Sequence, residues 1–209
     1  MMIGYFDMSG YKRRKKNTRI PRKVYVIVCE GKKTERIYFE KYRTRYSNLS
    51  IETPDSKYTD PKNLIKFAKQ YEENLTFDNG DTIWCVFDCD ENENDDLAKA
   101  CKIAGKDINI SFSNPNFELW FLLHFELYVT KIERSEVIQK LKKYIPQYKK
   151  NMNIYDLLKD KRPQAISNAR KLIKKHKKDG IKQISVESNP STQVYSIVEE
   201  ILKNTEEWN

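Results

Sequence analysis

Two apolar runs in the sequence each end in acidic residues, which places carboxylates where they could do chemistry. The run "VYVIVC" is followed directly by Glu30, and the run "TIWCVF" by Asp88 and Asp90. Because side chains alternate along a strand, Asp88 and Asp90 should point to one side and Cys89 to the other. If the two runs are neighbouring parallel strands, their carboxyl ends form one crevice and bring the acids together.

A fourth acid, Glu35, stands at the start of the segment that follows Glu30. Crowded carboxylates raise one another's pKa and destabilise the fold unless a cation neutralises them. Oxygen-only ligand sets favour hard ions such as Mg²⁺ or Mn²⁺. Such an ion polarises a phosphoryl oxygen and lowers the pKa of a bound water, while a spare carboxylate moves the proton. The acids therefore favour hydrolysis of phosphodiester bonds.

The charge of the chain favours nucleic acid as the partner. The 209 residues include 39 Lys and Arg against 30 Asp and Glu, a net charge of +9, and basic proteins attract polyanions. Residues 11–23 form a basic arm that could follow a phosphate backbone, although a solvated tail has the same composition. The expected phosphate contacts are Lys12, Arg13, Arg14, Lys15, Lys16, Lys32, Lys33 and Lys150.

The segments that must position the acids alternate between strands and helices. Strands are expected over 24–30, 82–87 and 108–112. A helix with Thr34 as its N-cap should follow the first strand, a second should follow Pro61, and a third should end at Gly105. This alternation predicts a mostly parallel sheet with helices on both faces.

The second half of the chain is predicted to be helical. Asn114 and Pro115 supply a cap and a first-turn proline for an apolar helix from residue 116 onward. From residue 131 the sequence is rich in lysine with helical periodicity. The predicted organisation is a basic arm (1–23), a catalytic core (24–130) and a helical lobe packed on the core (131–209). Residues 47–62 and 146–163 are too irregular to assign.

Glu118 and His124 lie in the apolar segment "NFELWFLLHFELY". Burial of an unpaired Glu118 would be costly. Glu118 therefore has a basic partner, caps its own helix, or serves the site as a metal ligand or base. His124 is either a hydrogen-bonded core residue, the commoner role on an apolar helix, or a participant in the chemistry near the site.

Cysteine usage and hydropathy exclude several classes of protein. Cys29, Cys85, Cys89 and Cys101 form no CxxC pair, so structural zinc is not expected, and a chain of this length needs no disulfides. The most apolar segment is too short and too interrupted by charge to span a bilayer, and the N-terminus lacks the apolar region of a signal peptide. We expect a cytoplasmic protein without membrane association.

The acidic segment "DCDENENDD" has two simpler interpretations. It could be an acidic loop that caps the next helix. It could also be a calcium loop, because Asp88, Asp90 and Asn92 have the spacing of the first three EF-hand ligands. The calcium loop is disfavoured, since Glu93 replaces the turn glycine and Lys99 stands where the bidentate glutamate belongs.

Four ordered motifs resemble one known family. The motifs "VCEGKKTERIYF", "VFDCDEN", "SNPNFELWFLLHF" and "NPSTQVYSIVEEI" are similar in order and wording to the RloB-like proteins of bacterial and archaeal restriction and defence loci, whose core resembles a TOPRIM domain. The resemblance covers most of residues 24–202. It implies a TOPRIM-like α/β fold, with a mostly parallel sheet flanked by helices and a C-terminal helical lobe.

The resemblance also implies roles for the acids. Glu30 would be the signature glutamate and general acid or base, and Asp88 and Asp90 would be the ligands of Mg²⁺ or Mn²⁺, with Glu30 beside them at the metal. Glu35 corresponds to the second acid of the EGxxTE motif. The predicted catalytic set is therefore Glu30, Glu35, Asp88, Asp90 and Glu118.

Asn114 and Glu118 match the family's SNPxFE segment and are expected near the site. Cys89 departs from the arginine usual in the family between the two aspartates, which puts in doubt an arginine contact to phosphate or to a neighbouring acid at that place. TOPRIM nucleases of defence systems act on DNA or on structured RNA, including tRNA, so the resemblance supports a nuclease without choosing its substrate.

The favoured function is a metal-dependent endonuclease acting on RNA or DNA in antiviral defence. An activating partner protein, such as a defence-system ATPase, and a homodimer are compatible with the resemblance. One alternative is a non-catalytic nucleic-acid-binding or sensor module. A less favoured alternative is a phosphatase of the haloacid-dehalogenase type with Asp88 as nucleophile, against which Asn92 stands where the usual threonine would be.

Overall fold

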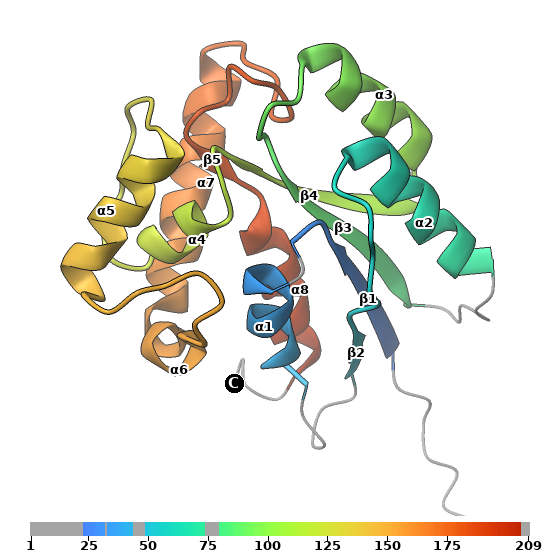
Figure 1. Ribbon diagram of the computed structural model, residues 1–209, viewed down its shortest axis with the longest axis horizontal. Coiled ribbons are helices and arrows are strands. Elements are labelled where there is room, and N and C mark those ends of the chain that lie inside the picture. The colour runs from blue at the N-terminus through green and yellow to red at the C-terminus, as the bar shows by residue number, and fades with distance from the viewer. Residues whose placement is uncertain (1–22, 32, 44–48, 74–79, 206–209) are drawn as a thin grey trace, which may run out of the picture.

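The fold is built on a five-stranded sheet between two layers of helices (Figure 1). The computed structural model describes residues 23–31, 33–43, 49–73 and 80–205. The strands of the described chain are β1 (Lys23–Cys29), β2 (Leu49–Glu52), β3 (Thr82–Asp88), β4 (Ile108–Asn114) and β5 (Ser191–Thr192). Their order is β2-β1-β3-β4-β5, and all pairs are parallel except β4 with β5.

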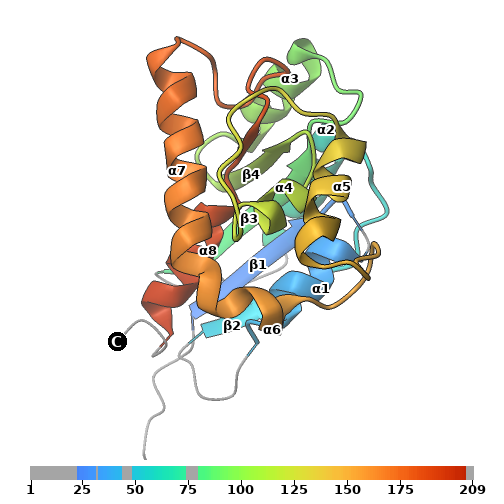
Figure 2. The same ribbon diagram turned by 90° about the vertical axis from the view of Figure 1, so that its left-hand side faces the viewer.

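The helices form two groups on opposite faces of the sheet. Their bounds are α1 (Thr34–Glu40), α2 (Pro61–Glu73), α3 (Asn94–Ala104), α4 (Glu118–Leu122), α5 (Arg134–Tyr144), α6 (Tyr155–Leu158), the 3₁₀ helix η1 (Lys159–Lys161), α7 (Arg162–Lys178) and α8 (Val194–Asn204). Helices α2 and α3 cover one face, and α1 and α4 to α8 lie on the other, which is the face turned toward the viewer in Figure 2.

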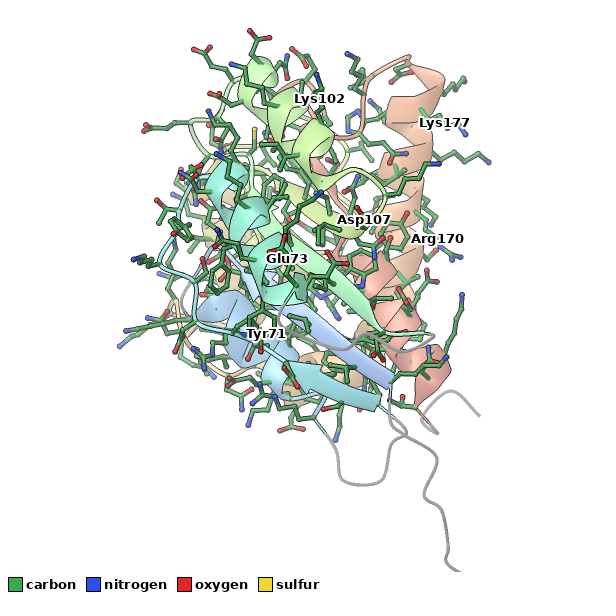
Figure 3. All side chains as sticks on the ribbon, turned by 90° about the vertical axis from the view of Figure 1, so that its right-hand side faces the viewer. Tyr71, Glu73, Lys102, Asp107, Arg170 and Lys177 are labelled. Carbon is green, nitrogen blue, oxygen red and sulfur yellow. The ribbon has the colours of Figure 1, made fainter. Side chains whose placement is uncertain are left out.

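The strands divide the interior into two apolar clusters. In β1, Tyr25 and Ile27 pack with the layer that contains α1, α4, α7 and α8, whereas Val26 and Val28 pack against α2 and α3. This alternation explains why the central strands are apolar at consecutive positions, as is typical of parallel strands buried on both faces. Tyr71 adds a polar link on the second face, where its hydroxyl donates to Glu52 of β2 at 2.9 Å (Figure 3).

The register of the central strands aligns their acidic ends. Cys29 of β1 pairs with Val86 of β3, and the backbone N–H of Glu30 donates to the Val86 carbonyl at 2.9 Å. On the other side of β3, Asp88 pairs with Ser113 of β4. Glu30 and Asp88 therefore leave neighbouring strands at the same edge of the sheet.

The predicted α/β, TOPRIM-like fold with a mostly parallel sheet flanked by helices is confirmed. The C-terminal part is helical, but it also belongs to the sheet layer, because β5 pairs with the end of β4. Residues from both sides of position 130 share one apolar cluster, as Ile27 and Leu122 do with Leu141 and Ile197. The segment predicted as a lobe thus completes one face of the sheet.

Several local predictions are wrong in detail. Thr34 is the first residue of α1 and Lys33 is its N-cap. Asn114 ends β4 instead of capping a helix, because its side-chain amide donates to the carbonyls of Ser185 and Val186 at 3.1 and 3.2 Å.

The apolar helix predicted from residue 116 is also shorter than expected. It is limited to the five residues of α4. After α4 the Phe125 ring stacks on Tyr144 of α5, with the ring centroids 4.7 Å apart. No described helix is long and apolar enough to cross a membrane.

Candidate functional site

A cavity of about 410 Å³ opens at the carboxyl ends of β1 and β3. It is lined by Glu30, Gly31, Lys33, Thr34, Glu35, Thr59, Asp88, Asp90, Glu118, Arg134, Lys150 and Asn151. All five acids predicted to be catalytic are in this set, together with Lys33 and Lys150 from the predicted phosphate contacts. Segments far apart in the sequence thus converge at one edge of the sheet.

Glu30 is bound to the backbone of the neighbouring strand. The N–H of Asp88 donates to Glu30 Oε2 at 3.1 Å. Burial raises the pKa of Glu30 to about 7, an effect that the Asp88 N–H opposes and the charge of Glu35 reinforces. A carboxyl group that titrates near neutral pH can both accept and release a proton, which suits general acid-base chemistry.

Asp88 is a buried carboxylate of the site with one oxygen atom left unpaired by the described residues. It is only 7% exposed, and its Oδ1 atom has no hydrogen-bond partner among the described residues. Burial raises the pKa of Asp88 well above its usual value, and the charges of Glu35 and Glu30 raise it further. An added cation at this position would relieve both the unpaired oxygen and the repulsion.

Arg134 partly neutralises this acidic pair. Its guanidinium lies 3.7 Å from Asp88 Oδ2 and forms a close ion pair with Asp90 Oδ1. Asp90 adopts a left-handed backbone conformation, with φ of 42°, and lines the cavity with Asp88. Cys89 between them is buried on the other side of the sheet, in the cluster of α2 and α3, as the strand alternation predicts.

Glu35 rests on Gly31. Glu35 is 8% exposed in the first turn of α1, and a Cβ atom at Gly31 would overlap its carboxylate. Burial raises the pKa of Glu35, and among the neighbouring charges Glu118 raises it while Lys150 and Arg134 lower it. Glycine at position 31 is therefore required for the close approach of this acid to the loop after β1.

Glu118 is paired with a tyrosine hydroxyl. Glu118 is the first residue of α4 and 3% exposed, and the Tyr148 hydroxyl donates to its Oε1 at 3.3 Å. Burial, and next the charge of Glu118, raise the pKa of Tyr148 above its usual value. The partner of Glu118 is thus a neutral donor, and the carboxylate still faces the cavity.

Replacing Tyr148 with phenylalanine should lower the free energy of unfolding by about 1–2 kcal/mol, because a buried carboxylate would lose its hydrogen-bond donor. Tyr144→Phe is the matched control, since the Tyr144 hydroxyl also donates to a glutamate, Glu126 at 3.0 Å, but at the surface. We expect a change within about 0.5 kcal/mol for the control. Urea denaturation measures both, and equal effects of the two variants would contradict the buried pairing.

The stability of the metal-free protein should fall as the pH rises from about 4.5 to 7. Glu30 has a pKa of about 7 in the folded protein and a model value of 4.5, so the folded state binds more protons than the unfolded state in this window. The stabilisation is complete below 4.5 and lost above 7. Glu35 and Asp88 act in the same direction because burial raises the pKa of each as well.

Urea denaturation in a chelating buffer at pH 5 and pH 7.5 measures this dependence. In Glu30→Gln the loss of unfolding free energy between the two pH values should be smaller by about 2 kcal/mol than in the wild type. The comparison between the two proteins removes the contribution of all other titrating groups. An identical pH dependence in wild type and variant would show that Glu30 ionises normally.

Two residues predicted near the site do not line the cavity. The amide of Asn114 is used by the backbone carbonyls described above. His124 is 1% exposed and donates from Nδ1 to the Trp120 carbonyl at 2.8 Å, and burial lowers its pKa to about 4. His124 is therefore a neutral core residue that satisfies a carbonyl near the end of α4. Lys32 and the predicted basic arm, Lys12 to Lys16, lie outside the described residues.

Arg134 and Asn151 were not foreseen from the sequence. Both lie in the second half of the chain, and Asn151 has φ of 73° and donates its N–H to Thr34 Oγ1 at 3.4 Å. One signal for Arg134 is its position as the first residue of α5, where the helix dipole disfavours a positive charge. An acidic partner would offset this effect, but the sequence pattern does not indicate which acid that is.

The donor set of the cavity fits a hard divalent cation. The carboxylates of Glu30, Asp88 and Asp90 supply only oxygen, and Asp88 Oδ1 is buried without a partner among the described residues. Within that part of the chain, no three His, Cys, Asp or Glu side chains already form a set that could hold a metal ion. Asp88 and Asp90 are paired with Arg134 instead.

Comparison with known proteins places the chain in a family. The family model described as RloB-like protein matches residues 25–201, a range that includes every described residue of the cavity. A search of curated proteins and a search of solved structures each returned no match. The chain belongs to the RloB-like protein family.

Proposed function

We propose that the protein is a metal-dependent endonuclease that cleaves phosphodiester bonds in RNA or DNA in antiviral defence. The observation that carries this proposal is the convergence of Glu30, Asp88 and Asp90 in one cavity with Lys33 and Lys150. Acids of this kind suit a hard cation, and lysines suit the phosphates of a polyanion. Membership of the RloB-like family is consistent with this chemistry.

The site residues divide into two roles. Asp88, Asp90 and Glu30 would hold Mg²⁺ or Mn²⁺, which, when bound, supplies charge stabilisation for the reacting phosphate and a more acidic water. Glu30, with its pKa of about 7, would accept the proton of the attacking water or return one to the leaving oxygen. Lys33 and Lys150 would position the phosphate backbone across the cavity.

The proposal is tested by incubating the purified protein with end-labelled RNA, tRNA included, and with single- and double-stranded DNA. We expect cleavage of at least one substrate with Mg²⁺ or Mn²⁺ and none with a chelator. A nuclease that needs an activating partner would be inactive when purified. The wild type and Glu30→Gln are therefore also expressed in cells, and growth and protection under phage challenge are compared. The proposal is refuted if no substrate is cleaved and the two strains do not differ in growth or protection.

A non-catalytic nucleic-acid-binding or sensor module is the second candidate. The ion pairs of Arg134 with Asp88 and Asp90 favour it, because they partly neutralise these two acids without any added cation. This candidate predicts binding of nucleic acid that does not depend on divalent ions and that survives substitution of Glu30. A nuclease instead predicts that Glu30→Gln binds its substrate and leaves it intact.

A further inference from the structure

The guanidinium of Arg134 occupies the position between the two aspartates that end β3. It lies 3.7 Å from Asp88 Oδ2 and is in direct contact with Asp90 Oδ1. The start of α5 is fixed by a capping box in which Glu133 and Glu136 exchange side-chain and backbone hydrogen bonds. Arg134 is therefore held at a defined place, with its side chain aimed at both carboxylates.

A guanidinium and a divalent cation compete for such oxygens. Arg134 carries a permanent charge, and its planar fork matches carboxylate geometry. The Arg134 side chain is 42% exposed and that of Asp88 is 10% exposed. Breaking these ion pairs thus moves the arginine further into water, whereas Asp88 stays buried and needs another cation.

We propose, on the basis of the proposed function, that Arg134 is an exchangeable counter-cation. It holds Asp88 and Asp90 in the metal-free protein, releases them to a divalent cation, and then binds a phosphate of the nucleic acid. Asp88 still has one unpaired buried oxygen while Arg134 is in place, so the arginine satisfies the pair incompletely and a divalent cation can replace it.

The surroundings of Arg134 favour phosphate as its second partner. Lys33 and Lys150 line the same cavity, so the released guanidinium would join two other positive groups at its mouth. Arginine binds phosphate through two parallel hydrogen bonds. Because coupling between two ligands is reciprocal, the cation and the phosphate should strengthen each other's binding through Arg134.

The first test measures affinity for Mn²⁺ without nucleic acid, by calorimetry or electron paramagnetic resonance. Arg134→Ala and Arg134→Gln should each bind Mn²⁺ about tenfold more tightly than the wild type, because Mn²⁺ no longer competes with the guanidinium for the carboxylates. One positive charge beside a carboxylate typically changes its proton affinity by a factor of about ten or more, which sets the scale of the effect. Lys142→Ala is the control, since it removes one positive charge from an exposed position of the same helix. It should leave the affinity unchanged.

The second test measures binding of a short fluorescent single-stranded RNA, by anisotropy, in Ca²⁺ or in a chelator. The wild type should bind more tightly in Ca²⁺, and Arg134→Ala should lose most of this gain. Arg134→Lys, which keeps the charge without the fork, should retain only part of it. An equal gain in wild type and Arg134→Ala would overturn the phosphate contact.

The outcomes separate this inference from the proposed function. Equal or weaker Mn²⁺ binding in both Arg134 variants, or no Mn²⁺ binding by any variant, would overturn the exchange. Tighter Mn²⁺ binding by the Arg134 variants, together with neither cleavage by the wild type nor a difference between the wild-type and Glu30→Gln strains, would uphold the exchange and refute the nuclease proposal. Thermal unfolding gives an independent check, because added Mg²⁺ should stabilise folded Arg134→Gln more than it stabilises the wild type.

Discussion

Replacing Glu30 with glutamine and replacing Asp88 with asparagine should each lower the rate of nucleic acid cleavage by at least about 100-fold, because the first removes the general acid or base and the second removes a ligand of the proposed cation. Glutamine cannot take up a proton in the pH range where Glu30 titrates, near its pKa of about 7. Asparagine at position 88 removes a negative charge from the cation site. Both substitutions keep the size of the side chain, so the fold should be retained.

The rate is measured under single-turnover conditions with the substrate that the wild type cleaves. Asp107→Asn is the control, since Asp107 is an exposed acid that precedes β4, at the end of the sheet opposite the cavity (Figure 3). Its rate should equal that of the wild type. Cleavage at the wild-type rate in both Glu30→Gln and Asp88→Asn would mean that the acidic edge of the sheet is not the active site.

The acidic edge could be predicted because its determinants are local. An apolar run of the length of β1 or β3 that ends in acids indicates a buried strand with a polar end, and alternating strands and helices imply parallel pairing. Pairing of β1 with β3 then brings Glu30 next to Asp88. The sequence alone leaves that adjacency open, because it does not state which strands are neighbours.

The parts that were missed depend on contacts distant in sequence. Strand β5 consists of only two residues, Ser191 and Thr192, too few for any periodicity, and it exists because β4 offers an edge. Arg134 is separated from Asp88 by the whole of α3, β4 and α4. Its role follows from where α5 begins relative to the sheet, which no local pattern records.

The roles of positively charged residues on the helix surfaces also depend on contacts that the sequence does not show. Helix α7 is rich in lysine, and Lys177 on it points away from the body of the protein (Figure 3). Arg170 on the same helix is instead used by Glu199 of α8 at 2.7 Å. Positive residues of one helix thus have different roles. Lys150 lines the cavity, whereas no residue of α7 is among its lining residues.

Gly31→Ala should lower the cleavage rate by about 100-fold and change the free energy of unfolding by less than about 1 kcal/mol. The new methyl group would overlap the Glu35 carboxylate. This carboxylate is the end of a flexible side chain, so it can move aside and relieve the overlap without unfolding the protein. Its displacement would alter the position of an acid that faces Asp88 and Glu118 across the cavity.

A double-mutant cycle shows whether the effect of Gly31→Ala passes through Glu35. With Glu35→Ala as the background there is no carboxylate to overlap, so adding Gly31→Ala should leave the remaining rate unchanged. Gly180→Ala is a control for the loss of a glycine, because nothing lies within 4 Å of the added methyl group. It should destabilise the protein through its backbone conformation, with φ of 70°, and leave cleavage intact. If Gly31→Ala lowered the rate equally in both backgrounds, the close approach of Glu35 to the loop after β1 would have no part in catalysis.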